Sequence, residues 1–550
     1  MKRKGTACTK CRLFQMTNNI LNDKQGGVML HFTITEPYLW IPFDHTEPEV
    51  KLHFYVDGKK IQEIDMRLGG TSGDFYACME VGGYLGRDLE IRADVSKELL
   101  DGIFCYAQKP QNVYPFRPKL HFSPQIGWHN DPNGLVYADG QYHLYYQWNP
   151  YGVEWGNMHW GHAVSRDLLY WEHEPMVMAP NEKGAVYSGC AWEDRENQTG
   201  HGEHALLFYY TAAGGRSEWS VEAGNPLFTQ RLAVSTDAGK TLRDSDAFFM
   251  GHIMGENRDP KICYHESLGT YHMVLYLDGN TFAFFRSVDL QNWEETQRLS
   301  MEGMWECPDL FELSVDGTDG EKKWVFWSAD GYYVVGDFDG FQFTPQSEVL
   351  CAYGTKIPYA AQTYAGIKGR IVSIAWLRLQ NTRGNYKGIM SLPAELSLVK
   401  QGQGYRIRLQ PVRELTALRG FLGNLPAGQR QASIPLNGNP MEICLSWNPE
   451  TDGQTKLTLG NTAILVDFAK AEICVHETGA DAQPAGIPFV SAAPLTLRIV
   501  IDQEALEFYG NGGVLYGVAE LEENALGKVF GMESGVDLQS AEWYVLGEQA

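Results

Sequence analysis

Short runs of alternating apolar and polar residues cover most of the chain, and this period of two predicts β-strands. Between 28 and 107 one such run is residues 51–56 (KLHFYV), and the Asp57-Gly58 pair after it is typical of a hairpin turn. Between 119 and 397 aromatic strands alternate with Gly, Asp, Asn and Pro, and no helical-period run is long enough for βαβ units. The pattern therefore predicts an all-β fold.

Two changes along the chain predict domain borders. Residues 109–118 (KPQNVYPFRP) are rich in proline, as in a semi-rigid connector. Residues 400–404 (KQGQG) predict a turn, and the strands after it are more aliphatic. We expect a flexible leader at 1–27, an N-terminal β-rich accessory domain at 28–110, a linker at 111–118, a central domain at 119–397 and a C-terminal β-sandwich at 398–550.

A short pattern recurs in the central domain. SRD at 165–167, STD at 235–237 and SVD at 287–289 each follow an apolar strand. A supersecondary unit repeated in this way indicates a β-propeller, and about 280 residues would hold five blades. Ser-x-Asp is also ordinary turn chemistry, in which Asp binds its own backbone, so the repeat has a second interpretation.

Charge and hydropathy narrow the class of protein. The 550 residues carry a formal net charge of −23, which argues against a nucleic-acid partner. Although 44% of the residues are hydrophobic, no uninterrupted apolar run approaches the roughly 18 residues of a membrane span. The basic N-terminus lacks the apolar stretch of a secretory signal, so we expect a cytoplasmic protein, or a chain whose signal was removed.

The cysteines and histidines give no metal site. The ten cysteines are scattered, mostly within apolar runs, as buried free thiols in a reducing compartment would be. Cys8 and Cys11 form a CxxC, but a second pair of zinc ligands is not visible nearby. The histidines at 159 and 162, and those at 201 and 204, lack a third ligand at a suitable spacing. We predict no metal and no cofactor.

Three acidic residues stand in turns that contain proline. Asp131 lies in NDPNG (130–134), Asp259 in NRDP (257–260) and Glu306 in WECPD (305–309). Because the blades of a propeller bring such turns together at one mouth of the central channel, we expect these carboxyl groups to converge. A pair of carboxyl groups, one ionised and one protonated, is the machinery of glycoside hydrolysis.

Aromatic residues crowd the segment that follows Asp131. Flat rings with polar tips suit the walls of a sugar site, although most of these rings are expected to pack in the core. Trp155 stands between Glu154 and Gly156 in a turn-like segment. We therefore predict that Trp155 lines a pocket.

The sequence resembles glycoside hydrolase family 32, the β-fructosidases that include invertases, levanases and exo-inulinases. The resemblance rests on motifs that occur in the family's order, which are GWHNDPNG (127–134), YHLYYQWNP (142–150), WGNMHWGHAVSRDLLYWEH (155–173), YSG (187–189), RDP (258–260), ECPDL (306–310), YAAQT (359–363) and MSLPAEL (390–396). LRIVIDQEALEFYGNGG at 497–513 is similar to the family's C-terminal sandwich. The resemblance implies a five-bladed β-propeller catalytic domain followed by a β-sandwich, with residues 1 to about 110 outside the common core.

The resemblance also implies roles for individual residues. Asp131 would be the nucleophile, Glu306 the general acid/base and Asp259 the transition-state stabiliser, kept ionised by the neighbouring Arg258. The residues that match the fructose-binding positions of the family are Asn130, Gln147, Trp155, Tyr187, Ser188, Arg258 and Trp376.

One histidine and two cysteines in these motifs need separate comment, because they depart from the family or have two interpretations. His129 stands where an apolar residue is usual, and either packs in the core or acts on a sugar hydroxyl or the nucleophile. Cys190 replaces a common serine, which leaves the substrate preference open. Cys307, shared with relatives, is implied to influence the acid beside it, or is a small buried residue.

The implied function is a retaining, exo-acting β-fructofuranosidase. It would hydrolyse terminal non-reducing β-D-fructofuranosyl residues of sucrose, fructo-oligosaccharides or fructans by double displacement. The alternatives are a fructosyltransferase with the same residues, a non-catalytic fructan-binding propeller, and an arabinanase-like propeller. The expected partner is a small sugar or an oligosaccharide, with no nucleic acid and no membrane. A homodimer is an open alternative, as are the chain length and the linkage preferred.

Overall fold

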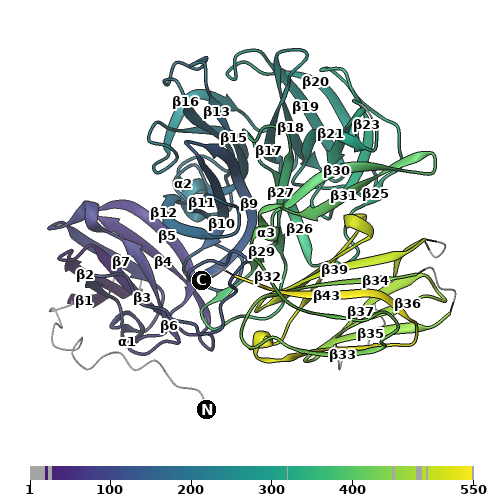
Figure 1. Ribbon diagram of the computed structural model, residues 1–550. Coiled ribbons are helices and arrows are strands. Elements are labelled where there is room, and N and C mark those ends of the chain that lie inside the picture. The colour runs from purple at the N-terminus through teal and green to yellow at the C-terminus, as the bar shows by residue number, and fades with distance from the viewer. Residues whose placement is uncertain are drawn as a thin grey trace.

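The computed structural model describes residues 19–22, 28–318, 320–448, 452–477, 486–490 and 493–547, and β-strands dominate them, as predicted. The N-terminal domain (purple) and the C-terminal domain (green to yellow) both pack against the central domain (Figure 1). No helix of the described residues is long and apolar enough to cross a membrane.

The N-terminal domain consists of two antiparallel sheets around one apolar core. The larger sheet has the strand order β1 (Asn19–Asn22), β2 (Val28–Thr33), β7 (Asp88–Ala93), β4 (Glu49–Val56) and β5 (Lys59–Arg67). The smaller sheet has the order β6 (Phe75–Glu80), β3 (Tyr38–Phe43) and β8 (Phe104–Tyr106), and two short helices are η2 (Gly82–Tyr84) and α1 (Lys97–Leu100). Strands β5 and β6 are therefore edge strands.

One expectation about the N-terminal region changes. Strand β1 pairs with β2 and lies within the range expected to be a leader, so the sheet starts at Asn19 rather than at 28. Cys8 and Cys11 lie outside the described residues. The linker at 111–118 contacts the central domain: the Arg117 guanidinium lies 4.3 Å from the centre of the Tyr386 ring.

The central domain contains four sheets, and within them most strands that follow one another in the chain pair antiparallel. The first sheet holds β9 (Gly127–Ala138), β10 (Gln141–Asn149), β11 (His159–Ser165), β12 (Trp171–Met178) and the short β28 (Tyr386–Lys387). The second holds β13 (Ala185–Asp194), β14 (Ala205–Ala213), β15 (Phe228–Ser235) and β16 (Arg243–Met250), with helix α2 (Glu218–Glu222) between β14 and β15. The third holds β17 (Arg258–His265), β18 (Thr270–Asp278), β19 (Thr281–Ser287) and β20 (Glu294–Ser300).

The fourth sheet of the central domain is larger because two groups of strands join. Its members are β21 (Asp309–Asp316), β22 (Lys322–Trp327), β23 (Tyr332–Phe338), β24 (Phe343–Pro345), β25 (Leu350–Cys351), β26 (Pro358–Thr363), β27 (Ile371–Leu377), β29 (Ile389–Met390), β30 (Ala394–Gln401) and β31 (Gly404–Pro411). The join is a short parallel pairing of β21 with β30. Helix α3 (Glu414–Ala417) follows β31.

The Ser-x-Asp pattern marks the same position in three sheets. Each serine ends the third strand of its sheet, and its hydroxyl donates a hydrogen bond to the aspartate two residues later at 2.7–3.0 Å. The turn interpretation and the repeat interpretation are therefore both right, because the same turn recurs in an equivalent place.

The first strands of the successive groups contact one another in a ring. Strand β9 contacts β13, β13 contacts β17, β17 contacts β21, β21 contacts β26, and β26 contacts β9 again. Residues from distant parts of the chain that lie on these inner strands are thereby brought close together.

The predicted border between 397 and 398 is wrong. It falls inside β30, which pairs with β31 along its whole length, so the central domain continues to Pro411. The Gly- and Gln-rich segment at 400–404 is the hairpin turn between these two strands, and Gly402 supplies its positive φ of 62°. Turn chemistry marked a hairpin here and not a change of domain.

The C-terminal domain is a sandwich of two six-stranded sheets. One sheet has the order β32 (Arg419–Leu425), β43 (Leu538–Leu546), β34 (Met441–Trp447), β39 (Leu495–Ile501), β40 (Ala505–Gly510) and β41 (Leu515–Glu520). The other has the order β33 (Gln431–Pro435), β42 (Val529–Ser534), β35 (Gln454–Leu459), β36 (Thr462–Asp467), β37 (Glu472–Glu477) and β38 (Ile487–Pro488), and η3 (Asn511–Gly513) and η4 (Ala525–Gly527) are short helices. Near its end, strand β39 is apolar on both faces, because Ile499 packs in the sandwich core and Val500 packs against the central domain.

A buried histidine joins the central domain to the sandwich. His121 donates from Nδ1 to Asp502 at 3.1 Å and from Nε2 to Glu507 at 3.0 Å, so both ring nitrogens carry protons. Burial opposes the charge, but the two carboxylates outweigh it and raise the pKa of His121 to about 9. The backbone N–H groups of residues 119–121 also donate to Asp502, whose pKa is lowered despite its burial.

The ion pairs of His121 with Asp502 and Glu507 predict that the stability of the protein depends on pH. Because the folded pKa of His121 lies above its usual 6.5, the stabilisation is full below pH 6.5 and is lost as the pH rises through 9. His121→Gln leaves two buried carboxylates without a cation and should lower the free energy of unfolding by about 3–5 kcal/mol near pH 6.5. Differential scanning calorimetry from pH 6 to 10 should show the deficit shrinking toward pH 10. The exposed His252→Gln is the matched control, and a deficit that stays constant would contradict this account.

Candidate active site

The three predicted acids come together where three inner strands begin. Asp131 lies on β9, Asp259 lies on β17, and Glu306 precedes β21. The thiol of Cys307 lies 3.7 Å from Oδ2 of Asp131 and 3.5 Å from Oδ2 of Asp259. The convergence expected from the sequence is therefore present, and the thiol lies between two of the three carboxyl groups.

Three residues at this site have a positive φ, a backbone conformation that residues other than glycine rarely adopt. Asp259 has a φ of 63°, Glu306 one of 25° and Cys307 one of 45°. Local contacts hold it: the Cys307 N–H donates to Asp259 Oδ2 at 3.0 Å, and the Asp259 N–H donates to the Thr211 hydroxyl at 3.1 Å. Strain of this kind persists only where the surroundings over-determine it, and it is typical of functional sites.

Asp131 is held by two donors in addition to the Cys307 thiol. The Ser188 hydroxyl donates to its Oδ2 at 2.6 Å, and the Asn130 amide donates to its Oδ1 at 3.2 Å. Burial nevertheless raises the pKa of Asp131 to about 6, and the nearby charge of Glu306 adds to the rise. Asp131 is therefore a carboxylate at neutral pH, but a more basic one than an ordinary aspartate.

Arg258 is bound mainly to Glu306. Its Nε and Nη2 donate to Glu306 Oε2 at 3.2 and 2.7 Å, whereas its Nε lies 3.7 Å from Asp259. Arg258 favours the ionised form of Asp259, as expected, but burial raises the pKa of Asp259 to about 7, and the charges of Glu306 and Asp131 add to the rise. The burial of this carboxyl group therefore outweighs the effect of the guanidinium.

Tyr359 is a site residue that the sequence did not single out. It lies on β26, and its hydroxyl donates a hydrogen bond to Glu306 Oε1. The Arg378 guanidinium lies 4.0 Å from the centre of the Tyr359 ring. Tyr359 opens the YAAQT segment, so the signal was present, but nothing in one sequence tells a buried core tyrosine from one that faces an acid.

A buried ion pair joins the strands beneath the acids. The Lys261 ammonium on β17 lies 3.5 Å from Asp309 on β21, and both side chains are buried. Asp309 also accepts from the backbone N–H and the hydroxyl of Thr363 on β26 at 2.8 and 2.9 Å. Sequence reasoning missed this pair, which ties together three inner strands.

Aromatic rings line the approach to the acids. Trp155 is 53% exposed, and its ring meets that of Tyr187 edge-on with centroids 6.0 Å apart. Trp376 lies 6.0 Å from Tyr359 and 5.5 Å from Trp128, again edge-on. The Tyr187 hydroxyl and Trp376 Nε1 are buried and have no hydrogen-bond partner within the part of the chain that the structure describes. These unpaired groups are suited to binding sugar hydroxyls.

Three other residues singled out from the sequence make contacts within the protein. The Gln147 amide donates to the Val186 carbonyl at 2.9 Å and so links β10 to β13. The His129 ring is buried between Phe122 and Tyr146, and burial lowers the pKa of this ring to about 3, so it is neutral. Cys190 is buried, and its sulfur accepts from the Ile262 N–H at 3.3 Å.

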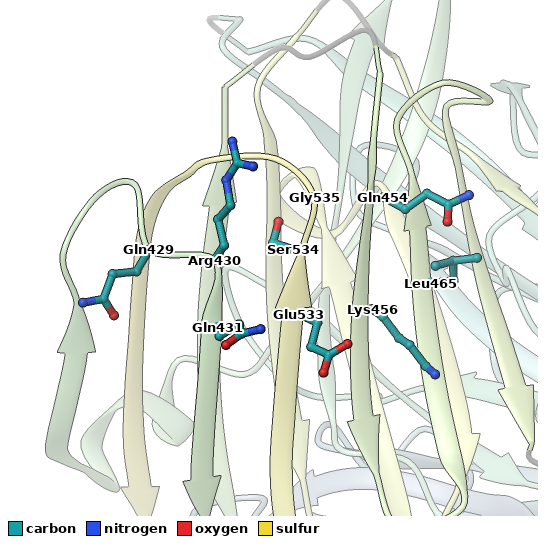
Figure 2. A pocket seen from close by; sticks show the side chains of 9 residues that line it. All are labelled: Gln429, Arg430, Gln431, Gln454, Lys456, Leu465, Glu533, Ser534 and Gly535. Atoms are coloured by element: carbon teal, nitrogen blue, oxygen red, sulfur yellow. The ribbon is translucent and has the colours of Figure 1, made fainter.

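A hollow elsewhere on the molecule does not share this chemistry. It has a volume of about 680 Å³ and lies on the outer face of the sandwich (Figure 2). Its lining residues are Gln429, Arg430, Gln431, Gln454, Lys456, Leu465, Glu533, Ser534 and Gly535. One carboxylate among these nine lining residues offers no pair for acid and nucleophile.

Comparison with known proteins agrees with this geometry. The description "Glycosyl hydrolases family 32 N-terminal domain" matches residues 121–411, more than half of the chain. A levanase of Bacillus subtilis (strain 168) is 33% identical over 460 residues, which are 72% of this chain and 65% of that protein. A levanase of Bacillus sp. (strain L7) is 28% identical over 569 residues, covering 89% of this chain and 57% of that protein. The chain thus spans less than two thirds of the length of either levanase.

The solved structure of an exo-inulinase from Aspergillus awamori has the same fold. Its TM-score is 0.70 at 24% sequence identity, and the match covers 80% of this chain and 99% of that chain. A paired-carboxylate site at the head of inner strands, on an all-β domain followed by a sandwich, defines the class as that of glycoside hydrolases. Within that class, the chain belongs to glycosyl hydrolases family 32.

The raised pKa of Asp131 predicts a stability gain on removing its charge. A carboxyl group with a folded pKa above its usual 3.8 costs stability as the pH rises through about 6. Asp131→Asn should therefore raise the free energy of unfolding by about 1–3 kcal/mol at pH 8 and by little at pH 4. Thermal unfolding at both pH values measures this, with the exposed Asp246→Asn as control. A gain that grows on acidification would contradict the assignment.

Proposed function

We propose that the chain is a retaining, exo-acting β-fructofuranosidase. It removes terminal non-reducing β-D-fructofuranosyl residues from sucrose, fructo-oligosaccharides or fructans. The observation that carries the proposal is the convergence of Asp131, Asp259 and Glu306, with Ser188 bound to the first and Arg258 bound to the last. The family, and relatives described as levanases and an exo-inulinase, support fructosides as the substrate class.

The proposed reaction proceeds in two displacements. A carboxylate oxygen of Asp131 forms a bond to C2 of the fructosyl unit as the bond from C2 to the leaving oxygen breaks, and that oxygen takes a proton from Glu306. Water then gives a proton to Glu306 while its oxygen bonds to C2 and releases Asp131. The donors on Glu306 are Arg258 and Tyr359, which hold it in place through both steps.

Asp259 would bind the sugar rather than react with it. Its Oδ2 is held by the Cys307 N–H, and the thiol, whose pKa is raised by burial and stays protonated, donates to the same oxygen. Oδ1 is thereby left for sugar hydroxyls. Those bonds would strengthen as positive charge develops on the fructosyl ring in the transition state.

We also propose that the central domain is a five-bladed propeller. The ring of contacts through β9, β13, β17, β21 and β26 supports five units around one axis. The pairing of β21 with β30 would then be a contact between two neighbouring blades.

A product assay tests the function. Sucrose, 1-kestose, inulin and levan are incubated with the wild-type chain, and products are resolved by anion-exchange chromatography. We expect fructose to be released stepwise, and Asp131→Asn to lower the rate by at least about 10⁴-fold because the nucleophile is lost. Glu306→Gln should slow sucrose cleavage by about 10²–10⁴-fold but spare an aryl fructoside with a good leaving group.

The other outcomes of this assay separate the alternatives. Longer oligosaccharides at high sucrose would mean a fructosyltransferase. Binding without turnover would mean a fructan-binding protein, and release of arabinose from arabinan would mean an arabinanase-like enzyme. Full activity of Asp131→Asn would remove the assignment of the nucleophile.

The hydrogen bond from Ser188 predicts a shift of the acidic limb. This bond lowers the pKa of Asp131, so Ser188→Ala should raise that pKa further. The acidic limb of kcat/KM, expected near pH 6, should move upward by about one unit, because the nucleophile must be ionised. The exposed Ser433→Ala in the sandwich is the control. An unmoved limb would show that another group controls it.

A further inference from the structure

The N-terminal domain reaches the candidate active site through its edge strand β5. An edge strand presents unpaired backbone N–H and C=O groups. The Asn157 side chain of the central domain fills this edge: its Oδ1 accepts from the Asp65 N–H at 2.8 Å, and its Nδ2 donates to the Asp65 carbonyl at 2.6 Å. The carboxamide thus replaces one residue of a neighbouring strand. Asn157 has a φ of 43°, which asparagine tolerates better than most residues.

The same strand holds the segment around Asn157 at two more points. The Arg67 guanidinium lies 3.2 Å from the carboxylate of Glu154, and the Gln62 amide lies 3.2 Å from Nε2 of His159. Asn149 closes the segment from within, because its Nδ2 donates to the Glu154 carbonyl at 2.9 Å. Residues 150–158, which we call the Trp155 loop, are therefore fixed from both sides.

The Trp155 loop belongs to two domains at once. Tyr151 and Val153 pack in the core of the N-terminal domain. The Gly152 carbonyl, between them, accepts from the Trp128 N–H at 2.8 Å, three residues before Asp131. Trp155 itself stands out of the loop beside Tyr187, which precedes Ser188.

A second contact from β5 fixes the start of helix α2. Glu63 is buried, and its carboxylate accepts from the backbone N–H groups of Glu218 and Trp219, where α2 begins, at 3.0 and 3.2 Å. The ammonium groups of Lys51 and Lys60 lie 3.4 and 2.6 Å from the same carboxylate, so its charge is compensated. His53, Glu63 and Glu218 lie close enough together to hold a metal ion, but two ammonium groups already pair with the Glu63 carboxylate.

We propose that strand β5 is a positioning element of the active site, and that it sets sugar binding by fixing the Trp155 loop. The inference rests on the proposed function. An exposed indole binds the apolar face of a sugar only if its orientation is held, since ordering it on binding would cost affinity. The carboxyl groups are held by other strands, so loosening this loop affects binding more than chemistry.

A double-mutant cycle on Asn157 and Trp155 tests the proposal. Asn157→Ala should raise KM for sucrose and 1-kestose by about fivefold or more, with kcat within about threefold of wild type. Trp155→Ala should raise KM as well. Asn157→Ala should then add nothing further in the Trp155→Ala background, because both changes remove the same interaction. A KM effect of Asn157→Ala that is equally large in that background would overturn the proposal.

The chain offers a matched control on another edge strand, β6. Asn112 of the linker pairs with Tyr76 on β6 in the same manner: its Nδ2 donates to the Tyr76 carbonyl at 2.9 Å, and its Oδ1 accepts from the Tyr76 N–H at 3.5 Å. Asn112→Ala removes an equivalent contact of the N-terminal domain far along the chain from Trp155. It should leave KM and kcat unchanged, and a KM rise equal to that of Asn157→Ala would mean a general structural effect.

Hydrogen–deuterium exchange gives a readout that does not require activity. Backbone exchange within residues 150–158 should rise at least about tenfold in Asn157→Ala and stay as in wild type in Asn112→Ala. If the wild-type chain cleaves no fructoside, the proposed function fails. Exchange and the binding of fructose to Asn157→Ala then still decide whether β5 positions the loop. Unchanged exchange in Asn157→Ala would overturn the inference in either case.

Discussion

The whole site depends on keeping three carboxyl groups close together in a poorly solvated place. Burial and mutual repulsion raise the pKa of Asp131 and Asp259, so the cluster is costly by itself. It is held by a guanidinium, a thiol and a hydroxyl, from Arg258, Cys307 and Ser188. The backbone at Glu306 and Cys307 is strained as well, so the fold enforces a local conformation that this segment would not adopt alone.

That enforcement comes from the ends of the inner strands. Each strand delivers one or two groups, and the Lys261–Asp309 pair joins the strands beneath them. The other two domains act on this arrangement from outside. The sandwich holds the start of the central domain through His121, and the N-terminal domain contacts the rim through β5. Chemistry at the centre is therefore supported by contacts with both neighbouring domains.

Sequence reasoning succeeded where one local signal carried the answer. Period-two patterns gave an all-β chain, and acids in proline turns gave Asp131, Asp259 and Glu306. It failed where one sequence signal was compatible with two different structures. Glycine and glutamine at 400–404 made a hairpin turn and not a domain border. Arg258 follows Asn257 and precedes Asp259 in sequence, yet its strongest bonds go to Glu306, because a guanidinium binds the carboxylate that it meets in space.

The sequence by itself therefore determined the class of fold, the family and which three acids converge, because local patterns and short motifs carry each of these. Only the tertiary structure decided which groups surround these acids and so shift their pKa values. Tyr359, the Lys261–Asp309 pair and the Asn157 contact with β5 join positions far apart in the chain. Hydrogen bonds and ion pairs act over a few ångströms, and which side chains come within that reach is set by the closing of the ring of strands and the docking of the domains.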